Sequence, residues 1–324
     1  MHRVWAGTFC TGLAGRLLAL HSGKSFCHYM EVFLTGGSGT IGQAVVSHLL
    51  EDGCKVIALS RSEQSADKLR HLGATVFPGD LTCPEEWTQR AVSCEALVHL
   101  GATFAPDMGA VDRAAMFAIR KAARGKARPL KIIYTGGIWL YPAASDRYPL
   151  KETTAHAPLP PFAQMSETIR SLITSVELQV SVIHPALVCS AETGPVADLA
   201  NAALAGSPFK TRATLQTCWP LVEVSDLARL YSTVLRRQGF RLNVFGAGHP
   251  GLPVGELVDA VNQELETDLI LQTEAAPEDI PPTADWMAGY GRSQVLNTER
   301  SEKLSGWSPE HKTAETLVRA VLQV

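Results

Sequence analysis

Residues 32–42 read VFLTGGSGTIG, an apolar run followed by a turn with glycines at positions 36, 39 and 42. A helical pattern of apolar residues follows directly. Gly36 lets the chain turn sharply out of a strand, Gly39 leaves room for a phosphate beside the backbone, and Gly42 lets a helix pack closely on a sheet. The free N–H groups of that helix's first turn favour a bound anion. The stretch therefore predicts a strand, turn and helix that hold a dinucleotide; a tight turn without a ligand is the alternative.

The spacing Gly-x-x-Gly-x-x-Gly resembles the opening of the short-chain dehydrogenase/reductase superfamily. More narrowly, residues 35–42 resemble its extended or atypical branch, which is related to NAD-dependent epimerases and dehydratases. The resemblance continues to about residue 323 and implies an α/β Rossmann fold, a doubly wound parallel sheet with a small C-terminal substrate lobe. It also implies cofactor contacts from Gly36, Ser38, Gly39, Thr40, Ile41 and Gly42.

The composition suits one large α/β domain or one domain with a small lobe, with 324 residues, 46% of them hydrophobic and 19% charged. A net charge of −3 gives no field for nucleic acid or an anionic membrane. No apolar run reaches the ~20 residues that span a bilayer. Seven scattered cysteines without a Cys-x-x-Cys pair argue against disulfides and a metal site, and for a reducing compartment. We expect a cytoplasmic monomer or homodimer that acts on a small molecule.

Residues 1–29 differ from the rest, because they contain Arg3, Arg16 and Lys24 but no Asp or Glu. Acid-poor leaders can direct import into an organelle. The favoured alternative is a translation start at Met30, directly before the first strand, so we expect residues 1–29 to add little to the core. Residues 30–189 are expected to form the dinucleotide-binding domain. Residues 190–324 are expected to form the C-terminal part, with strands 221–224 and 242–246 returning to the sheet.

Strand and helix patterns alternate along the first domain, which predicts a parallel sheet with right-handed crossovers. The expected strands are residues 31–35, 55–59, 74–77, 95–100, 130–135 and 179–184. The expected helices lie near residues 40–52, 63–72, 84–92, 110–124 and 162–177, and later near 253–264, 298–304 and 312–323. A lobe over the carboxyl ends of the strands would place a substrate pocket at the switch point of the sheet.

The end of the second strand selects the cofactor. NAD-binding folds usually place an acid there to hold the ribose hydroxyls, but this chain has Ser60, Arg61 and Ser62. Arg61 with the two serines can bind a 2′-phosphate through charge-assisted hydrogen bonds. The sequence therefore favours NADP(H) over NAD(H); a solvated arginine is the alternative.

Further cofactor contacts are implied by the resemblance alone. Asp80 and Leu81 match the pair that lies beside the adenine, although Asp80 has a second possible role as the cap of the helix near Pro84. Small residues after the fourth strand let the backbone approach the nicotinamide ribose, and His99 before them is interpreted as a strand-end residue. These implied contacts are Leu100, Gly101, Ala102, Thr135, Pro185 and Leu187.

The catalytic residues of the family are largely replaced. Residues 134–142, YTGGIWLYP, resemble the segment Ser-Ser-x-x-x-Tyr-Gly, in which a hydroxyl polarises the substrate carbonyl; Thr135 is the hydroxyl left before Tyr141. In the family's Tyr-x-x-x-Lys pair the lysine lowers the tyrosine pKa and binds the ribose. Phe162 stands where that tyrosine is expected, and Met165 or Ser166 where the lysine is expected.

Any reaction would then need another acid or base. Tyr148 and Lys151 are three residues apart and precede the helix, so they are not expected to form the pair. The remaining candidates are Thr135, Tyr141, Tyr148, Glu167 and His184. His184 titrates nearest to neutrality, although a structural histidine at a strand end is favoured.

Three functions stay open from the sequence. The first is an NADP(H)-dependent oxidoreductase, or an epimerase- or dehydratase-like enzyme, that acts on a small metabolite. The second is a sensor or regulator that binds the dinucleotide without consuming it, and the third is a non-redox enzyme on the same fold. Turnover of the bound cofactor separates an enzyme from a sensor.

Overall fold

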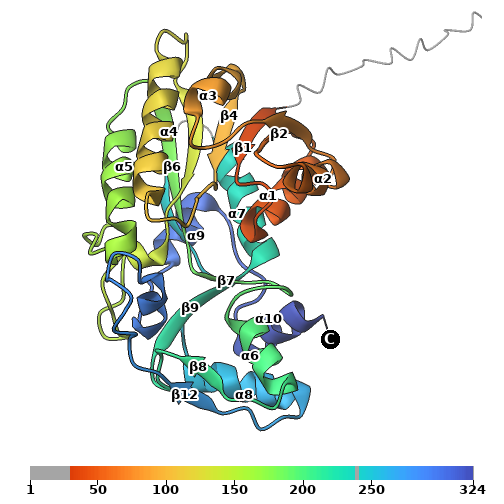
Figure 1. Ribbon diagram of the computed structural model, residues 1–324, viewed down its shortest axis with the longest axis vertical. Helices are drawn as coiled ribbons and strands as arrows, with labels where there is room; N and C mark the ends of the chain where they lie inside the picture. The colour runs from red at the N-terminus through yellow and green to blue at the C-terminus, as the bar shows by residue number, and fades with distance from the viewer. Residues whose placement is uncertain (1–29, 238–240, 324) are drawn as a thin grey trace, which may run out of the picture.

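A seven-stranded parallel sheet between two layers of helices forms the main body of the protein (Figure 1). The structure, a computed structural model, describes residues 30–237 and 241–323, so the expectations for residues 1–29 lie outside the described residues. The strand order is β10-β6-β5-β4-β1-β2-β3, which reverses between β1 and β4 and confirms the doubly wound α/β fold. The strands are β1 Glu31–Thr35, β2 Lys55–Ser60, β3 Thr75–Pro78, β4 Ala96–His99, β5 Leu130–Thr135, β6 Leu178–Pro185 and β10 Asn243–Gly246.

Helices cover both faces of this sheet, with α1 packed on α7 and α4 packed between α3 and α5. Local chemistry sets several helix starts. Ser62 accepts a hydrogen bond from the backbone N–H of Ser65 and caps α2. Pro84 begins α3, with two acids in its first turn facing the helix dipole. The helices are α1 Thr40–Glu51, α2 Glu63–His71, α3 Pro84–Ser93, α4 Met108–Ala123, α5 Ala163–Ile173, α7 Val224–Arg236 and α9 Glu299–Ser305.

A smaller lobe lies beyond the carboxyl ends of the strands (Figure 1). It contains a three-stranded sheet of order β11-β9-β7 and a two-stranded pair of β8 with β12. Its strands are β7 Leu187–Cys189, β8 Phe209–Thr211, β9 Cys218–Glu223, β11 His249–Pro253 and β12 Leu271–Thr273. Its helices α6 Pro195–Leu204, α8 Val254–Leu265 and α10 Ala314–Leu322 contact one another.

One expected strand is placed differently from the prediction. Residues 242–246 join the main sheet beside β6, but the strand at 221–224 does not return to it. Instead, β9 pairs parallel with β7 and antiparallel with β11. The physical reason is that β7 follows β6 after a single residue and leaves the main sheet, and β9 takes β7 as its partner while β10 occupies the edge of β6.

Buried polar contacts fix the C-terminal segment on α7. Asp226 is buried, forms an ion pair with Arg229 and accepts hydrogen bonds from the backbone N–H groups of Glu310 and His311. Glu223 accepts from the first N–H groups of α7 and so acts as its cap. Glu223, Asp226 and His311 lie close together, but both carboxylates already have these partners, so we assign the group to the fold.

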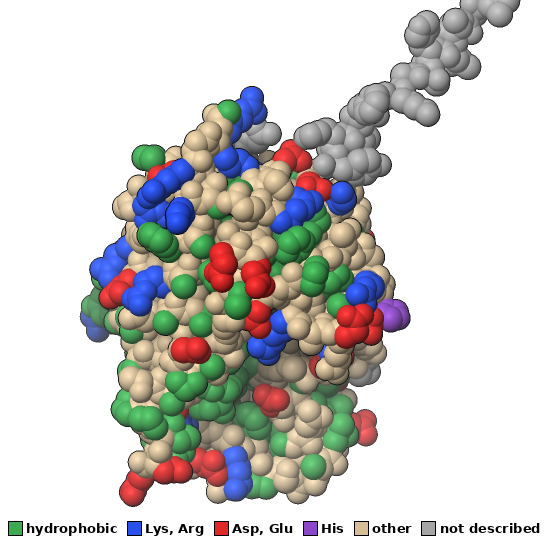
Figure 2. Space-filling model, turned by 45° about the horizontal axis from the view of Figure 1, so that its top comes forward, with side chains coloured by type: hydrophobic (Ala, Val, Ile, Leu, Met, Phe, Trp, Pro, Cys, Tyr) green, Lys and Arg blue, Asp and Glu red, His purple; other side chains and the backbone are tan. Residues whose placement is uncertain are grey.

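The outer surface mixes charges of both signs. Figure 2 shows acidic and basic side chains on the same face, with hydrophobic side chains gathered over its lower part. No helix within residues 30–237 and 241–323 combines the length and apolar character needed to cross a membrane.

Candidate active site

In the glycine turn between β1 and α1, neighbouring backbone atoms lie so close that two of the positions have no room for a side chain. Gly36 has a φ of +75°, and a Cβ there would lie 2.6 Å from the backbone of Leu100 and Gly101. A Cβ at Gly42 would lie 2.1 Å from the carbonyl oxygen of Gly36. At Gly39 the nearest atom would be 3.5 Å away, an ordinary contact, so this glycine leaves open space beside the backbone. Gly39 is the residue that precedes α1, and it offers no side-chain cap, so the first N–H groups of the helix are left for an anion.

A cavity of about 270 Å³ opens at the carboxyl ends of β4, β5 and β6, beside Ile41 of α1. This is the switch point of the sheet, where ligands of open α/β folds bind. Eight of the residues predicted to contact a cofactor line it: Ile41, Leu81, Leu100, Gly101, Ala102, Thr135, Pro185 and Leu187. The other nine lie outside its lining, at the ends of β1, β2 and β3: Gly36, Ser38, Gly39, Thr40, Gly42, Ser60, Arg61, Ser62 and Asp80.

The predicted 2′-phosphate site contains one exposed cation. Ser60 is buried and donates its hydroxyl to the carbonyl oxygen of Ser62, whose own hydroxyl caps α2. Arg61 between them is exposed and forms no ion pair within the described part of the chain. Asp80 accepts from the backbone and hydroxyl of Thr82, at 2.8 and 2.9 Å, rather than capping α3. These bonds, with burial opposing them and Arg61 nearby, hold the pKa of Asp80 below its ordinary value.

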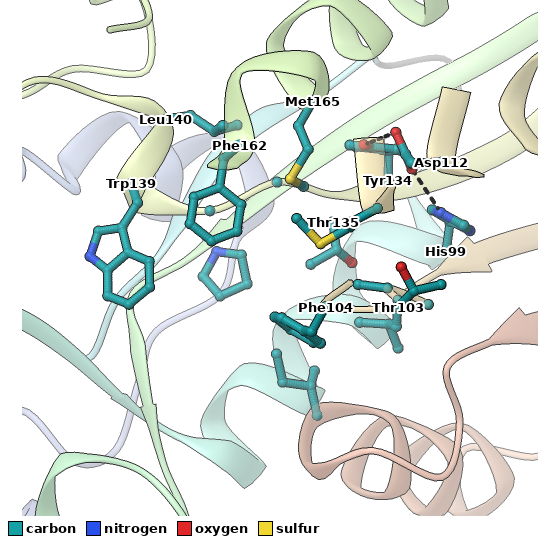
Figure 3. A pocket seen from close by; sticks show the side chains of 18 of the residues that line it. His99, Thr103, Phe104, Asp112, Tyr134, Thr135, Trp139, Leu140, Phe162 and Met165 are labelled. Atoms are coloured by element: carbon teal, nitrogen blue, oxygen red, sulfur yellow. Dashed lines mark hydrogen bonds and ion pairs between the residues drawn. The ribbon is translucent and has the colours of Figure 1, made fainter. Parts of the chain in front are cut away.

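A buried polar network forms one wall of the cavity (Figure 3). The backbone N–H of Gly101 donates to Oγ1 of Thr35 at 3.2 Å, and Oγ1 lies 2.8 Å from Nδ1 of His99. Nε2 of His99 lies 3.1 Å from one carboxylate oxygen of Asp112, and the Tyr134 hydroxyl donates to the other at 2.8 Å. Since a carboxylate only accepts, the Nε2 proton faces Asp112, and Nδ1 of His99 faces the Thr35 hydroxyl.

This network contains the ionisable side chains that line the cavity in the described part of the chain: His99, Asp112 and Tyr134. Burial, with Asp112 adding to it, raises the pKa of Tyr134 well above its ordinary value, so its hydroxyl keeps its proton at neutral pH. Sequence reasoning placed His99 at a strand end and missed the other two. The available signal was an acid on an otherwise apolar helix face, where Asp112 shares its side with Ala115 and Met116.

The glycines that replace the family's hydroxyls differ in their surroundings. Thr135 lines the cavity, and its Oγ1 lies 2.7 Å from the Tyr231 hydroxyl. A Cβ at Gly136 would lie 2.4 Å from Nδ1 of His184, whereas a Cβ at Gly137 would meet no atom within 4 Å. Position 136 is therefore closed to a larger residue by His184, and position 137 is open.

Two of the catalytic candidates do not line the cavity, which corrects their proposed role. Tyr141 is fully buried, and its hydroxyl donates to the carbonyl oxygen of Glu152 at 3.4 Å. His184 is fully buried, with Nε2 2.9 Å from Oδ1 of Asn243. Burial raises the pKa of Tyr141, and burial together with His156 lowers the pKa of His184 to about 3. Both rings pack against each other, with centroids 5.0 Å apart, and act as core residues.

The remaining candidates also lie away from the cavity. Tyr148 is 71% exposed and Glu167 is exposed on α5, and neither lines the cavity. Phe162 and Met165 line the cavity instead, at positions where the family's dyad was expected. Ser166 is buried, and its hydroxyl lies 3.0 Å from Nδ1 of His156.

The sequence model of the NAD dependent epimerase/dehydratase family matches residues 32–245. The chain belongs to this family. That confirms the resemblance drawn from the glycine turn, and this family uses nicotinamide dinucleotide cofactors. The chain is 26% identical over 298 residues to an uncharacterized protein of Schizosaccharomyces pombe, covering 89% of this chain and 97% of that protein. It is also 26% identical over 325 residues to UDP-glucose 4-epimerase of Mycolicibacterium smegmatis, covering 90% and 97%.

Solved members of the family share the architecture. The UDP-glucose 4-epimerase of Thermus thermophilus, in complex with NAD, superposes with a TM-score of 0.73 at 21% identity, covering 91% of this chain and 98% of that chain. UDP-glucuronic acid 4-epimerase of Bacillus cereus, in complex with UDP-glucuronic acid and NAD, superposes with a TM-score of 0.75 at 12% identity, covering 91% and 98%. At these identities the likeness establishes the fold, and the reaction has to be argued from the site.

Proposed function

We propose that this family member is an NADP(H)-dependent oxidoreductase that acts on a small metabolite without the Tyr-x-x-x-Lys dyad. The observation that carries the proposal is the cavity with three buried ionisable side chains in its wall, beside the predicted cofactor contacts Leu100–Ala102. A sensor needs the dinucleotide site alone. The same cavity also has His99, Asp112 and Tyr134 in its wall, and these ionisable side chains support a reaction beside the cofactor.

The residues around the glycine turn fit a dinucleotide. The open space at Gly39 and the uncapped first turn of α1 suit its phosphates. Exposed Arg61 at the end of β2 supports NADP(H), because its guanidinium would pair with a 2′-phosphate, whereas an acid there would repel it. Ser60 and Ser62 are already bonded within the turn, so Arg61 carries most of this preference.

The proton for such a reaction would come from the wall of the cavity. A reduced nicotinamide, when bound, would supply a hydride to a carbonyl carbon, and the carbonyl oxygen would then need a proton. Phe162, Met165 and Ser166 cannot provide the dyad's acid and base. We infer that Asp112 exchanges this proton: its carboxylate takes the hydroxyl proton when the alcohol is oxidised, and its protonated carboxyl group returns that proton when the carbonyl is reduced. His99 and Tyr134 hold the carboxyl group in place.

Calorimetric titration with NADPH and NADH tests the cofactor. The protein should bind NADPH more tightly, and Arg61→Ala should lose about 1.5–3 kcal/mol of NADPH affinity, as for a hydrogen bond to a charged group. Arg70→Ala is the matched control, because Arg70 is an exposed arginine of α2 that pairs with Glu63 and Asp67. Equal wild-type affinity for the two cofactors would contradict the preference. Binding without hydride transfer to any carbonyl substrate would instead identify a sensor.

We also propose a cytoplasmic site of action. The cysteines of the described residues are free, namely Cys54, Cys83, Cys94, Cys189 and Cys218, which supports a reducing compartment. Fluorescent fusions of the full chain and of a chain starting at Met30 test this. An organelle signal for the full chain alone would show that residues 1–29 direct import.

A further inference from the structure

We propose that the cavity accepts a neutral, largely apolar ketone with an aromatic or alicyclic ring, and not a nucleotide diphosphate sugar. The inference rests on the proposed function, since the ketone carbonyl would be the group that is reduced. Three features of the cavity support it: its lining, its charges and its one unpartnered hydroxyl.

The lining beyond the predicted cofactor contacts is apolar and partly aromatic (Figure 3). It includes Phe104, Met108, Val111, Trp139, Phe162 and Met165. The rings of Trp139 and Phe162 lie 5.9 Å apart, and Trp139 also packs on Tyr290 with centroids 5.4 Å apart. An aromatic or alicyclic ring that enters this space would leave water and pack against apolar side chains, which favours binding.

The charges of the cavity are unsuited to a diphosphate. No lysine or arginine is among its lining residues in the described part of the chain, and its wall contains the acidic Asp112. Two arginines outside the lining are already engaged. Arg292 donates to the carbonyl oxygens of Tyr141 and Ala157 at 2.6 and 2.9 Å, and Arg212 forms an ion pair with Asp285. A diphosphate would therefore lose its hydration without gaining a cation.

One hydroxyl in the lining has no protein partner. Oγ1 of Thr103 is buried and has no hydrogen-bond partner among the described residues. Buried hydroxyls are normally bonded, so this one is left for a ligand atom. It can donate to a neutral carbonyl oxygen, which suits a ketone.

The mouth of the cavity has an exposed aromatic ring. Phe104 lines the cavity, is 73% exposed and has a φ of 50°. A left-handed backbone is unfavourable for a bulky residue and is found where a ligand is clamped. An apolar ring on the substrate would cover the face of the Phe104 ring that is otherwise exposed to water.

Ligand titration of the full chain, with and without NADPH, tests the inference with 1-indanone, 2-decalone and UDP-glucose as probes. We expect the two ketones to bind and UDP-glucose not to bind. Phe104→Ala and Thr103→Val should each weaken ketone binding by about three- to tenfold. Phe117→Ala is the matched control, since Phe117 is 63% exposed on α4 outside this cavity and should bind ketones as the wild type does.

The outcomes separate the inference from the proposed function. Binding of UDP-glucose in preference to the ketones, binding of no probe, or equal weakening in Phe104→Ala and Phe117→Ala would overturn the inference. Because Phe104 and Phe117 are both exposed, both variants should keep the wild-type melting temperature. Ketones that bind and weaken as expected without any NADPH oxidation would uphold the inference and refute the oxidoreductase.

Discussion

Tyr134 donates its hydroxyl to one carboxylate oxygen of Asp112 at 2.8 Å, while Nε2 of His99 lies 3.1 Å from the other. Asp112 is only 9% exposed, and a buried carboxylate is costly unless both oxygens are bonded. The two contacts give each carboxylate oxygen of Asp112 a partner and fix the carboxyl group at the cavity wall. It also joins α4 to β4 and β5, so the geometry depends on three separate segments of the chain.

Replacing this carboxylate should abolish most of the proposed activity. Asp112→Asn keeps the shape of the side chain but cannot exchange a proton, so carbonyl reduction should fall by about 10²–10⁴-fold. NADPH affinity should stay at the wild-type value because Asp112 is not among the predicted cofactor contacts. Single-turnover oxidation of NADPH and calorimetric titration measure the two quantities.

Two further variants serve as controls for that experiment. Tyr134→Phe retains the carboxylate and removes one of its donors, so we expect a smaller loss of rate. Tyr148→Phe should leave the rate unchanged, because this tyrosine is 71% exposed and lies outside the cavity. A full wild-type rate in Asp112→Asn would remove Asp112 from the mechanism.

The two neighbouring glycines after β5 give a matched pair of variants. Gly136→Ser should lower the free energy of unfolding by about 1–3 kcal/mol, since its Cβ would lie 2.4 Å from the ring of His184. Gly137→Ser should change it by less than about 0.5 kcal/mol, as for an ordinary surface substitution, because no atom lies within 4 Å of its Cβ. Urea unfolding measures both. Equal losses in the two variants would show that His184 does not close position 136.

The fold was largely predictable because its signals are local. The strands 31–35 and 130–135 were predicted at their observed bounds, since central parallel strands are continuous apolar runs. The glycine turn was predictable because its three glycines recur at a fixed spacing between an apolar strand pattern and a helical pattern, although Gly36 makes its closest contacts with the distant Leu100 and Gly101. The strand at 221–224 was misplaced, since nothing in its own sequence says whether its partner is β6 or β7.

The site was less predictable, because burial and cross-chain contacts decide it. Tyr141 and His184 have suitable chemistry for catalysis, yet both are fully buried away from the cavity. Asp112 and Tyr134 meet only after α4 and β5 are packed together, 22 residues apart in the chain. Sequence reasoning identifies which side chains can react, but not which of them face the same space.

Thr35 should stabilise the loop that follows β4. Its hydroxyl accepts from the N–H of Gly101 and contacts His99, and the residue is fully buried. Thr35→Val preserves the shape but leaves these groups unbonded, so the free energy of unfolding should fall by about 1–3 kcal/mol. Thr75→Val, at an exposed position of β3, is the control and should cost little. Similar urea midpoints for both variants would contradict this role.

The stability of the protein should fall in mild acid because of His184. Burial, reinforced by nearby His156, lowers the pKa of His184 from its ordinary 6.5 to about 3. Between these two values the unfolded chain binds a proton that the folded chain does not, so the free energy of unfolding falls as the pH falls from 6.5 toward 3. Full stability from this group is therefore present above its unfolded pKa.

A neutral replacement isolates this contribution. Between pH ~7.5 and ~5 the wild type should lose about 1–2 kcal/mol more than His184→Gln, because glutamine takes up no proton. The variant should be less stable overall, since it disturbs the packing with Tyr141, so the change with pH is the quantity to compare. His71→Gln, at an exposed histidine of α2, should follow the wild-type curve. Parallel curves for wild type and His184→Gln in urea unfolding would show that His184 is not the buried neutral histidine that its contacts require.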